Sequence, residues 1–424
     1  MSYVLFFVYL LLCCYLLTRI KFVQQAGIET RIIVALFILK VGVGCLSGLL
    51  YMHDPSDSIT ANIWGWEEYQ LLLHHPKEYL LDLFQSGYAK PYGGLFETHG
   101  SYWNDLAANV EIKLLSVFDI FSRGHYIINV IFFNFITFFG ITGLFRVFTN
   151  VYPGNKNLLI VTCFLLPSLL CFSSMIHKEG LILAAIGILV FNVYYSLNFS
   201  GFTLLRILYI SLSLLFIFVL RTYVLMALLP ALFAWIFVCM KGYRPLPVFI
   251  IIYSIGLIMF FNLGRISHRL DLPKIVTQRQ ADFSELPVAK TQLPMDTLYP
   301  SFKSFVWHLP LALGHSLKRP YFSDVHSSLL LLPFAIEITV YGLLLLIFIF
   351  LYKDIDGPVS QGDKAMILFG IFFSFSVFLL IGYIVPNIGA ILRYRAIYLP
   401  FILTPVLCGI RSGLIKKRVI KMQA

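Results

Sequence analysis

Two charged clusters stand at the ends of apolar runs, where a membrane protein could carry out acid–base chemistry. One is His-Asp-Pro-Ser-Asp at 53–57, and the other is His-Lys-Glu-Gly at 177–180. The low dielectric beside a membrane raises a carboxyl pKa toward neutral pH, which suits a general base or a metal ligand. Asp57, Asp54 and Glu179 are therefore candidate catalytic residues, and His177 and Lys178 are candidate substrate-binding residues.

Both clusters also have a purely structural explanation. Residues 54–57 could form a capped turn, with Asp57 as the N-cap of the next helix. Residues 177–180 could be a solvated turn between two apolar helices. Ionisable groups near membrane depth are nevertheless functional candidates by default, and the residues alone leave both explanations open.

Three arginines could bind phosphate. Arg221 interrupts an apolar run, and Arg393 and Arg395 flank a tyrosine just before the last apolar segment. A guanidinium offers a planar fork of donors that fits phosphate and stays charged. A snorkelling helix-end arginine and an anchor for anionic lipid are the competing explanations. Lys40 and Glu337 lie inside apolar segments and receive no assigned role.

The composition places these clusters in a membrane protein. Of the 424 residues, 59% are hydrophobic and 12% are charged, with a mean hydropathy of +0.84, whereas soluble proteins have roughly 25% charged residues. The net charge of +11 does not indicate a nucleic-acid partner, because Lys and Arg are dispersed among apolar segments. Membrane lipids are the expected surroundings.

The apolar runs are continuous rather than alternating, which predicts helices because they satisfy every backbone hydrogen bond within the segment. We expect an all-α, polytopic transmembrane bundle with about eleven spans of roughly 20 residues. The pair at 204–240 is one long apolar run divided only at residues 221–222. The predicted spans are 3–18, 32–51, 126–147, 157–173, 180–197, 204–220, 222–240, 247–263, 327–352, 365–385 and 396–410.

Loop charges predict the orientation. With the basic tail at 411–424 in the cytoplasm, the short cytoplasmic segments hold fifteen Lys and Arg, and the short outer loops hold four. This asymmetry follows the positive-inside rule. The N-terminus is then expected outside and the C-terminus inside.

Two long stretches, 52–125 and 264–326, are expected as loops on the outer face of a single transmembrane domain spanning 1–424. The first has Trp-rich and amphipathic patterns around 63–66 and 105–121, which predict helices lying at the membrane surface. The second is basic and Pro-rich.

This layout resembles the GT-C superfamily of polytopic glycosyltransferases, which place large outer loops after the first and seventh core helices. If the span at 3–18 is an addition, both long loops fall where that family has them. The resemblance implies a polyprenyl-phosphate-linked sugar donor, a glycan or lipid acceptor, and a catalytic carboxylate at Asp54 or Asp57. Glu179 lies where a further acidic residue often occurs. The phrases at 174–180 and 392–395 are also similar to bacterial membrane proteins linked to surface polysaccharides, which implies the cytoplasmic (inner) membrane.

The expected function is therefore transfer of a sugar from a polyprenyl-phosphate carrier at the outer face. Asp57 or Asp54 would act as base, Glu179 would orient the acceptor or a divalent metal, and Arg221, Arg393 and Arg395 would hold the phosphate. No cofactor is required by any motif. An O-antigen-type polymerase or ligase is one alternative, and a transporter or flippase of a lipid-linked glycan is another.

Overall fold

The computed structural model describes residues 2–50, 57–85, 95, 101–351 and 360–423. Within these ranges the chain forms helices and no strand. It divides into two compact units. Unit 1 comprises Met1–Val147, Leu169–Ser196 and Ser200–Leu225, and unit 2 comprises Phe148–Ser168, Leu197–Phe199 and Met226–Ala424.

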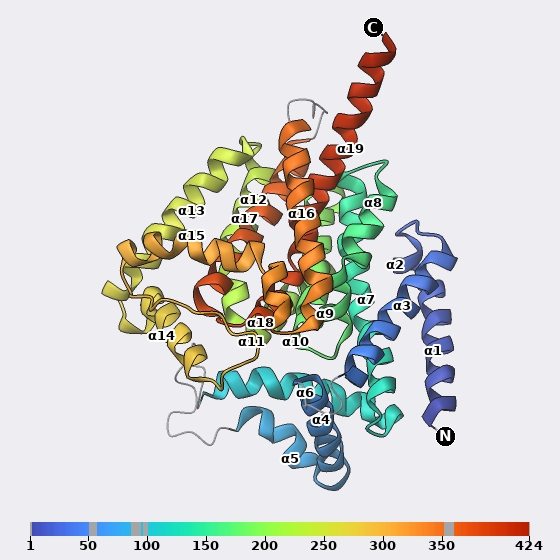
Figure 1. Cartoon of the computed structure of the whole chain (residues 1–424). Coiled ribbons are helices and arrows are strands. Elements are labelled where there is room, and N and C mark those ends of the chain that lie inside the picture. The colour runs from blue at the N-terminus through green and yellow to red at the C-terminus, as the bar shows by residue number, and fades with distance from the viewer. Residues whose placement is uncertain (1, 51–56, 86–94, 96–100, 352–359, 424) are drawn as a thin grey trace. The chain divides into compact units, whose positions relative to one another are not determined.

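Unit 1 holds the first six α-helices together with most of α7 and α9, and all of α10 and α11 (Figure 1). The bounds of these helices are α1 Ser2–Arg19, α2 Lys21–Gln24, α3 Thr30–Leu50, α4 Asp57–His74, α5 Pro76–Leu81, α6 Tyr102–Ser122, α7 Tyr126–Val151, α9 Pro167–Ser174, α10 Lys178–Tyr195 and α11 Leu204–Leu220.

Unit 2 holds α8, most of α12 and every later helix. The bounds of these helices are α8 Lys156–Ile160, α12 Thr222–Lys241, α13 Pro245–Asn262, α14 Leu272–Glu285, α15 Phe302–Lys318, α16 Leu332–Leu351, α17 Gln361–Ile384, α18 Ile388–Ala396 and α19 Leu399–Gln423.

Several helices can cross a bilayer, so the protein is a helical membrane protein. Among the described residues, seven helices are long and apolar enough, and two bent helix pairs raise the number to nine. The predicted spans at 3–18 and 204–220 correspond to α1 and α11, which are apolar but shorter. The predicted total of about eleven spans therefore stays a prediction, as do the orientation and the choice of membrane.

The apolar run at 204–240 forms two helices. Arg221 has an extended φ of −153° and separates α11 from α12. The segment before the last predicted span is also helical: α18 is followed by α19 at a bend of 67°. The sequence patterns around 63–66 and 105–121 fall in α4 and α6. Whether those two helices lie at a membrane surface stays a prediction.

Small residues allow close helix packing in unit 1. A Cβ atom added at Gly187 would lie 2.0 Å from the carbonyl oxygen of Gly140, so α7 and α10 approach backbone to backbone. α10 also packs along α11, and α4 packs along α6. These contacts fix the ends of α10 and α11, where the candidate site lies.

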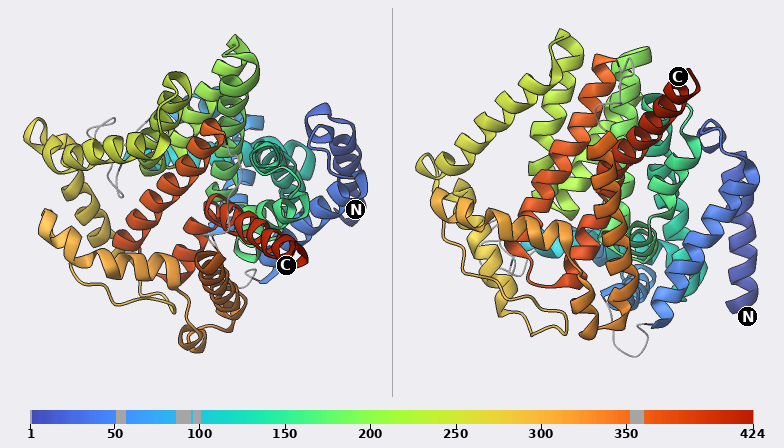
Figure 2. Two further views of the ribbon diagram at one scale, coloured as in Figure 1. Left: turned by 90° about the horizontal axis from the view of Figure 1, so that it is seen from above. Right: turned by 45° about the horizontal axis from the view of Figure 1, so that its top comes forward.

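In unit 2, α15 packs on α17 and runs across the directions of α16 and α17 (Figures 1 and 2). A Cβ atom at Gly382 would lie 2.0 Å from the Ala312 carbonyl oxygen, and the Tyr383 hydroxyl donates to the Phe305 carbonyl at 2.7 Å. The face of α15 with Phe305 and Ala312 is therefore buried, whereas Phe302, Val306 and Trp307 on its other face are exposed.

Candidate functional site

The clearest candidate site in unit 1 is an ion pair between Glu179 and Arg221. Glu179 lies in the first turn of α10 and is 3% exposed. Its Oε1 accepts a hydrogen bond from Arg221 Nη2 at 2.7 Å, and the Arg221 side chain is 22% exposed. The two residues are separate candidates in the sequence, and the fold brings them together across 42 positions.

Two buried polar side chains form hydrogen bonds to the turn that leads into α10. Lys40 on α3 is 2% exposed, and its ammonium donates to the carbonyl and the hydroxyl of Ser173. Asn134 on α7 donates to the Ser174 carbonyl at 2.9 Å. Lys40 is thus a supporting residue for the site. In the sequence, Lys40 is a single lysine inside an apolar segment, and this pattern alone does not identify the residues to which it donates hydrogen bonds.

The turn is closely packed by neighbouring helices. A Cβ atom at Gly44 would lie 2.5 Å from the Ser174 carbonyl oxygen, and one at Gly180 would lie 2.8 Å from the Phe133 ring. His177, the N-cap residue of α10, is 7% exposed, and Lys178 is half-buried. The segment 173–180 is therefore a packed part of the core rather than a solvated turn.

The other predicted acids lie at the start of the first long stretch. Asp57 begins α4 and is exposed, in the helix-end position where a carboxylate is favourable. Asp54 lies outside the described residues. The predicted meeting of Asp57 or Asp54 with Glu179 in one site stays a prediction.

Arg393 and Arg395 lie on α18 in unit 2, in different surroundings. Arg393 is half-buried and donates from Nη2 to the Tyr394 hydroxyl at 3.2 Å. Arg395 is 1% exposed and donates from Nη1 to the Ser316 carbonyl at 2.8 Å. Its Nε and Nη2 have no hydrogen-bond partner among the described residues. A buried guanidinium with spare donors can bind an anion.

The negative charge that faces Arg395 belongs to Glu337 on α16. Glu337 is 5% exposed and accepts from the Ser168 hydroxyl at 3.0 Å, from the Ser168 backbone N–H and from the Tyr341 hydroxyl. The charges of Glu337 and Arg395 act on one another. The carboxylate is thus satisfied by other donors and does not occupy the spare N–H groups of Arg395.

Two further buried clusters lie in unit 1. Lys113 on α6 forms ion pairs with Glu68 on α4 and with Asp82, the latter at 2.8 Å, and its ammonium lies 3.7 Å from the centre of the Tyr79 ring. Burial raises the pKa of Glu68, although the charge of Lys113 acts in the opposite direction. This cluster joins α4, the segment after α5, and α6.

Asp119 closes the turn at the end of α6. Its Oδ1 accepts from the Ser122 hydroxyl at 2.7 Å, the Asn129 amide at 2.7 Å and the Gly124 backbone N–H at 3.1 Å. The side chain is fully buried, and its Oδ2 has no partner within the described part of the chain. Burial raises the pKa of Asp119, and the hydrogen bonds from Asn129 and Ser122 oppose that shift.

No metal site is evident in the ranges that the structure describes: no three His, Cys, Asp or Glu side chains there are grouped as metal ligands. His53 and Asp54 fall outside those ranges, so a divalent metal at the first cluster is untested. Comparison with protein-family models, curated proteins and solved structures finds no match for this chain.

Proposed function

We propose that this protein is a GT-C-type membrane glycosyltransferase that transfers a sugar from a polyprenyl-phosphate carrier to a glycan or lipid acceptor at the outer face of the membrane. The observation that carries the proposal is the Glu179–Arg221 pair, a buried carboxylate held by a partly exposed guanidinium at the break between two apolar helices.

In the proposed reaction, an acceptor hydroxyl attacks the anomeric carbon of the carrier-linked sugar. A new C–O bond forms, the bond from that carbon to the phosphate oxygen breaks, and the lipid phosphate leaves with the electron pair. The acceptor proton passes to a carboxylate, for which Asp57 and Asp54 are the candidates. Glu179, fixed by Arg221, orients the acceptor.

The phosphate that leaves carries growing negative charge, and cations already in place stabilise it most effectively. Arg221 provides one guanidinium whose orientation is set by Glu179, with Lys178 and His177 on the adjacent turn of α10. Arg393 and Arg395 provide further guanidinium groups on α18. We assign Arg221 and Lys178 in unit 1 to binding of the donor phosphate and His177 to binding of substrate, and we assign Arg393 and Arg395 in unit 2 separately as phosphate ligands.

The test measures incorporation of sugar from a polyprenyl-phosphate-linked donor into the glycan and lipid fractions of proteoliposomes. Glu179→Gln and Arg221→Gln should each lower the rate by about 100-fold or more, because each removes a positioned charge. Asp57→Asn should lower it by a similar factor if Asp57 is the base. Glu78→Gln, which changes an exposed glutamate on α5, serves as the matched control and should leave the rate unchanged.

Folding of each variant is checked by circular dichroism and by gel filtration in detergent. Full transfer activity in the Asp57, Asp54 and Glu179 variants would contradict the proposal. A deletion that removes only long-chain glycan, with single-sugar transfer unchanged, would favour a polymerase instead. Uptake of a lipid-linked glycan into liposomes without any covalent product would favour a flippase.

A further inference from the structure

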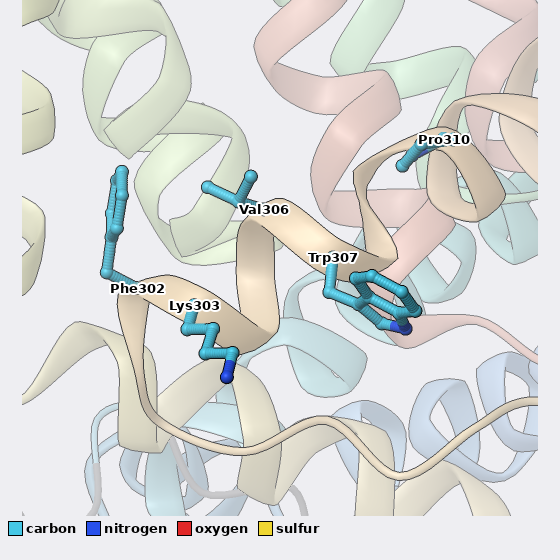
Figure 3. Close-up of a pocket in the computed structure, with 5 residues that line it drawn as sticks. All are labelled: Phe302, Lys303, Val306, Trp307 and Pro310. Atoms are coloured by element: carbon cyan, nitrogen blue, oxygen red, sulfur yellow. The ribbon is translucent and has the colours of Figure 1, made fainter.

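The uncovered face of α15 has a hollow that no part of the proposed transfer reaction uses. A pocket of about 570 Å³ is lined by residues from this one helix: Phe302, Lys303, Val306, Trp307 and Pro310 (Figure 3). Phe302, Val306 and Pro310 follow one another at every fourth position, and so do Lys303 and Trp307. They therefore form two adjacent rows on one face of the helix.

This face is strongly exposed although it is largely apolar. Phe302 is 59% exposed, Val306 is 51% and Trp307 is 79%. The opposite face, with Phe305 and Ala312, is buried against α17. Large exposed side chains of this kind, on a helix whose other face is packed, mark a surface made to meet an apolar partner.

The charges of α15 indicate which partner. Between Phe302 and Lys318 the helix has two lysines, two histidines and no acidic residue. Lys303 is exposed at the edge of the apolar pocket. An apolar wall with one ammonium group at its edge fits a molecule with an apolar chain and an anionic head.

The direction of α15 is also consistent with a partner that has an apolar chain and an anionic head. It runs across α16 and α17 (Figure 2), both of which belong to segments able to span a membrane. A helix that crosses the direction of the spans can lie in the plane of the membrane surface, with its tryptophan and lysine at headgroup level.

We infer that the α15 pocket is a binding site for an anionic membrane phospholipid, with an acyl chain against Phe302, Val306 and Pro310 and the phosphate near Lys303. Trp307 then lies at the boundary between the headgroup and the acyl chain. None of the five residues that line the pocket is among those assigned to sugar transfer.

Trp307 reports on this site directly. The protein is reconstituted in phosphatidylcholine vesicles that contain increasing fractions of phosphatidylglycerol, with brominated acyl chains on one lipid at a time. The Trp307 signal is the emission that is lost in Trp307→Phe. Brominated phosphatidylglycerol should quench it at about fivefold lower mole fraction than brominated phosphatidylcholine, the preference expected for one lysine near an anionic headgroup.

Lys303→Gln should abolish this preference, whereas Lys290→Gln, an exposed lysine outside α15, should preserve it. Equal quenching by both lipids in the wild type, or no quenching of the Trp307 signal, would overturn the inference. Displacement of brominated phosphatidylglycerol more effectively by a polyprenyl phosphate than by unbrominated phosphatidylglycerol would also overturn it. None of these quenching measurements depends on sugar transfer, so their outcome is independent of the proposed enzymatic function.

Discussion

Lys113 and Arg395 are both buried cations, with exposures of 9% and 1%, but their surroundings differ. Lys113 in unit 1 is enclosed by two carboxylates, the Tyr79 carbonyl and the Tyr79 ring. Arg395 in unit 2 donates to the Ser316 carbonyl, and two of its nitrogens lack hydrogen-bond partners among the described residues. A cation whose donors are satisfied within the fold serves stability, whereas one with unused buried donors is suited to a ligand.

The largest effect on stability should come from Lys113→Met. The substitution leaves the carboxylates of Glu68 and Asp82 without their shared cation in a partly buried site, which costs about 3–5 kcal/mol of unfolding free energy. Denaturation in detergent, followed by circular dichroism, measures the change. Lys77→Met, at an exposed position on α5, should change stability by no more than about 0.5 kcal/mol. Equal stability of the Lys113 variant and the wild type would show that the cluster is not structural.

Arg395→Met should have a smaller effect on stability and a larger one on activity. It removes the hydrogen bond to the Ser316 carbonyl and the positive charge that acts on Glu337, whose carboxylate keeps its hydrogen bonds from Ser168 and Tyr341. We expect a cost of about 1–3 kcal/mol in unfolding free energy and a loss of about 100-fold or more in sugar transfer. Arg395→Lys should not restore the rate, because an ammonium lacks the planar fork of a guanidinium.

Arg411→Met is the matched control for Arg395. Arg411 is exposed, and its Nη1 donates to the Gly154 carbonyl at 2.7 Å and to the Asn155 side-chain oxygen at 3.2 Å. Its loss also removes a hydrogen bond to a backbone carbonyl, but at an exposed position, and we expect no effect on transfer. A stability loss in the Arg395 variant as large as that of Lys113→Met, with transfer preserved, would reverse the comparison and make Arg395 a structural residue.

The smallest effect on stability is expected from Asp119→Asn. Asp119 is intermediate between Lys113 and Arg395, because one of its carboxyl oxygens accepts hydrogen bonds and the other has no partner among the described residues. Asparagine keeps Oδ1 as the acceptor for Ser122, Gly124 and Asn129, and it places its amide where Oδ2 lacks a partner among the described residues. We expect a change in unfolding free energy of no more than about 1 kcal/mol.

The raised pKa of Asp119 predicts the direction in which the stability of this variant, relative to the wild type, changes with pH. Because burial raises the pKa of Asp119 above its ordinary value of 3.8, the folded state holds the proton more tightly than the unfolded state does. The stabilisation that protonated Asp119 contributes to the wild-type fold is complete below pH 3.8. It is lost as the pH rises through the raised pKa of Asp119. The variant should therefore gain stability relative to the wild type between acidic and neutral pH. Parallel stability curves for the two proteins would contradict this.

Much of the local structure could be predicted from the sequence. The predicted apolar runs correspond to helices in the structure, because a continuous apolar stretch in lipid must satisfy its own backbone hydrogen bonds. The charge at Arg221 marks the place where one long run becomes two helices. The sequence also singled out Glu179, Arg221, Arg393 and Arg395 as unusual charges for their surroundings.

Only the tertiary structure decided which of these charges meet and how deeply each is buried. Glu179 pairs with Arg221, and Lys40 with the turn before α10, through the rotation and register of packed helices, which apolar periodicity does not fix when a helix is apolar all round. Arg393 and Arg395 are two positions apart, yet one is half-buried and the other almost inaccessible. On a helix, residues two apart point in different directions, so the neighbours that surround α18 determine which arginine is enclosed.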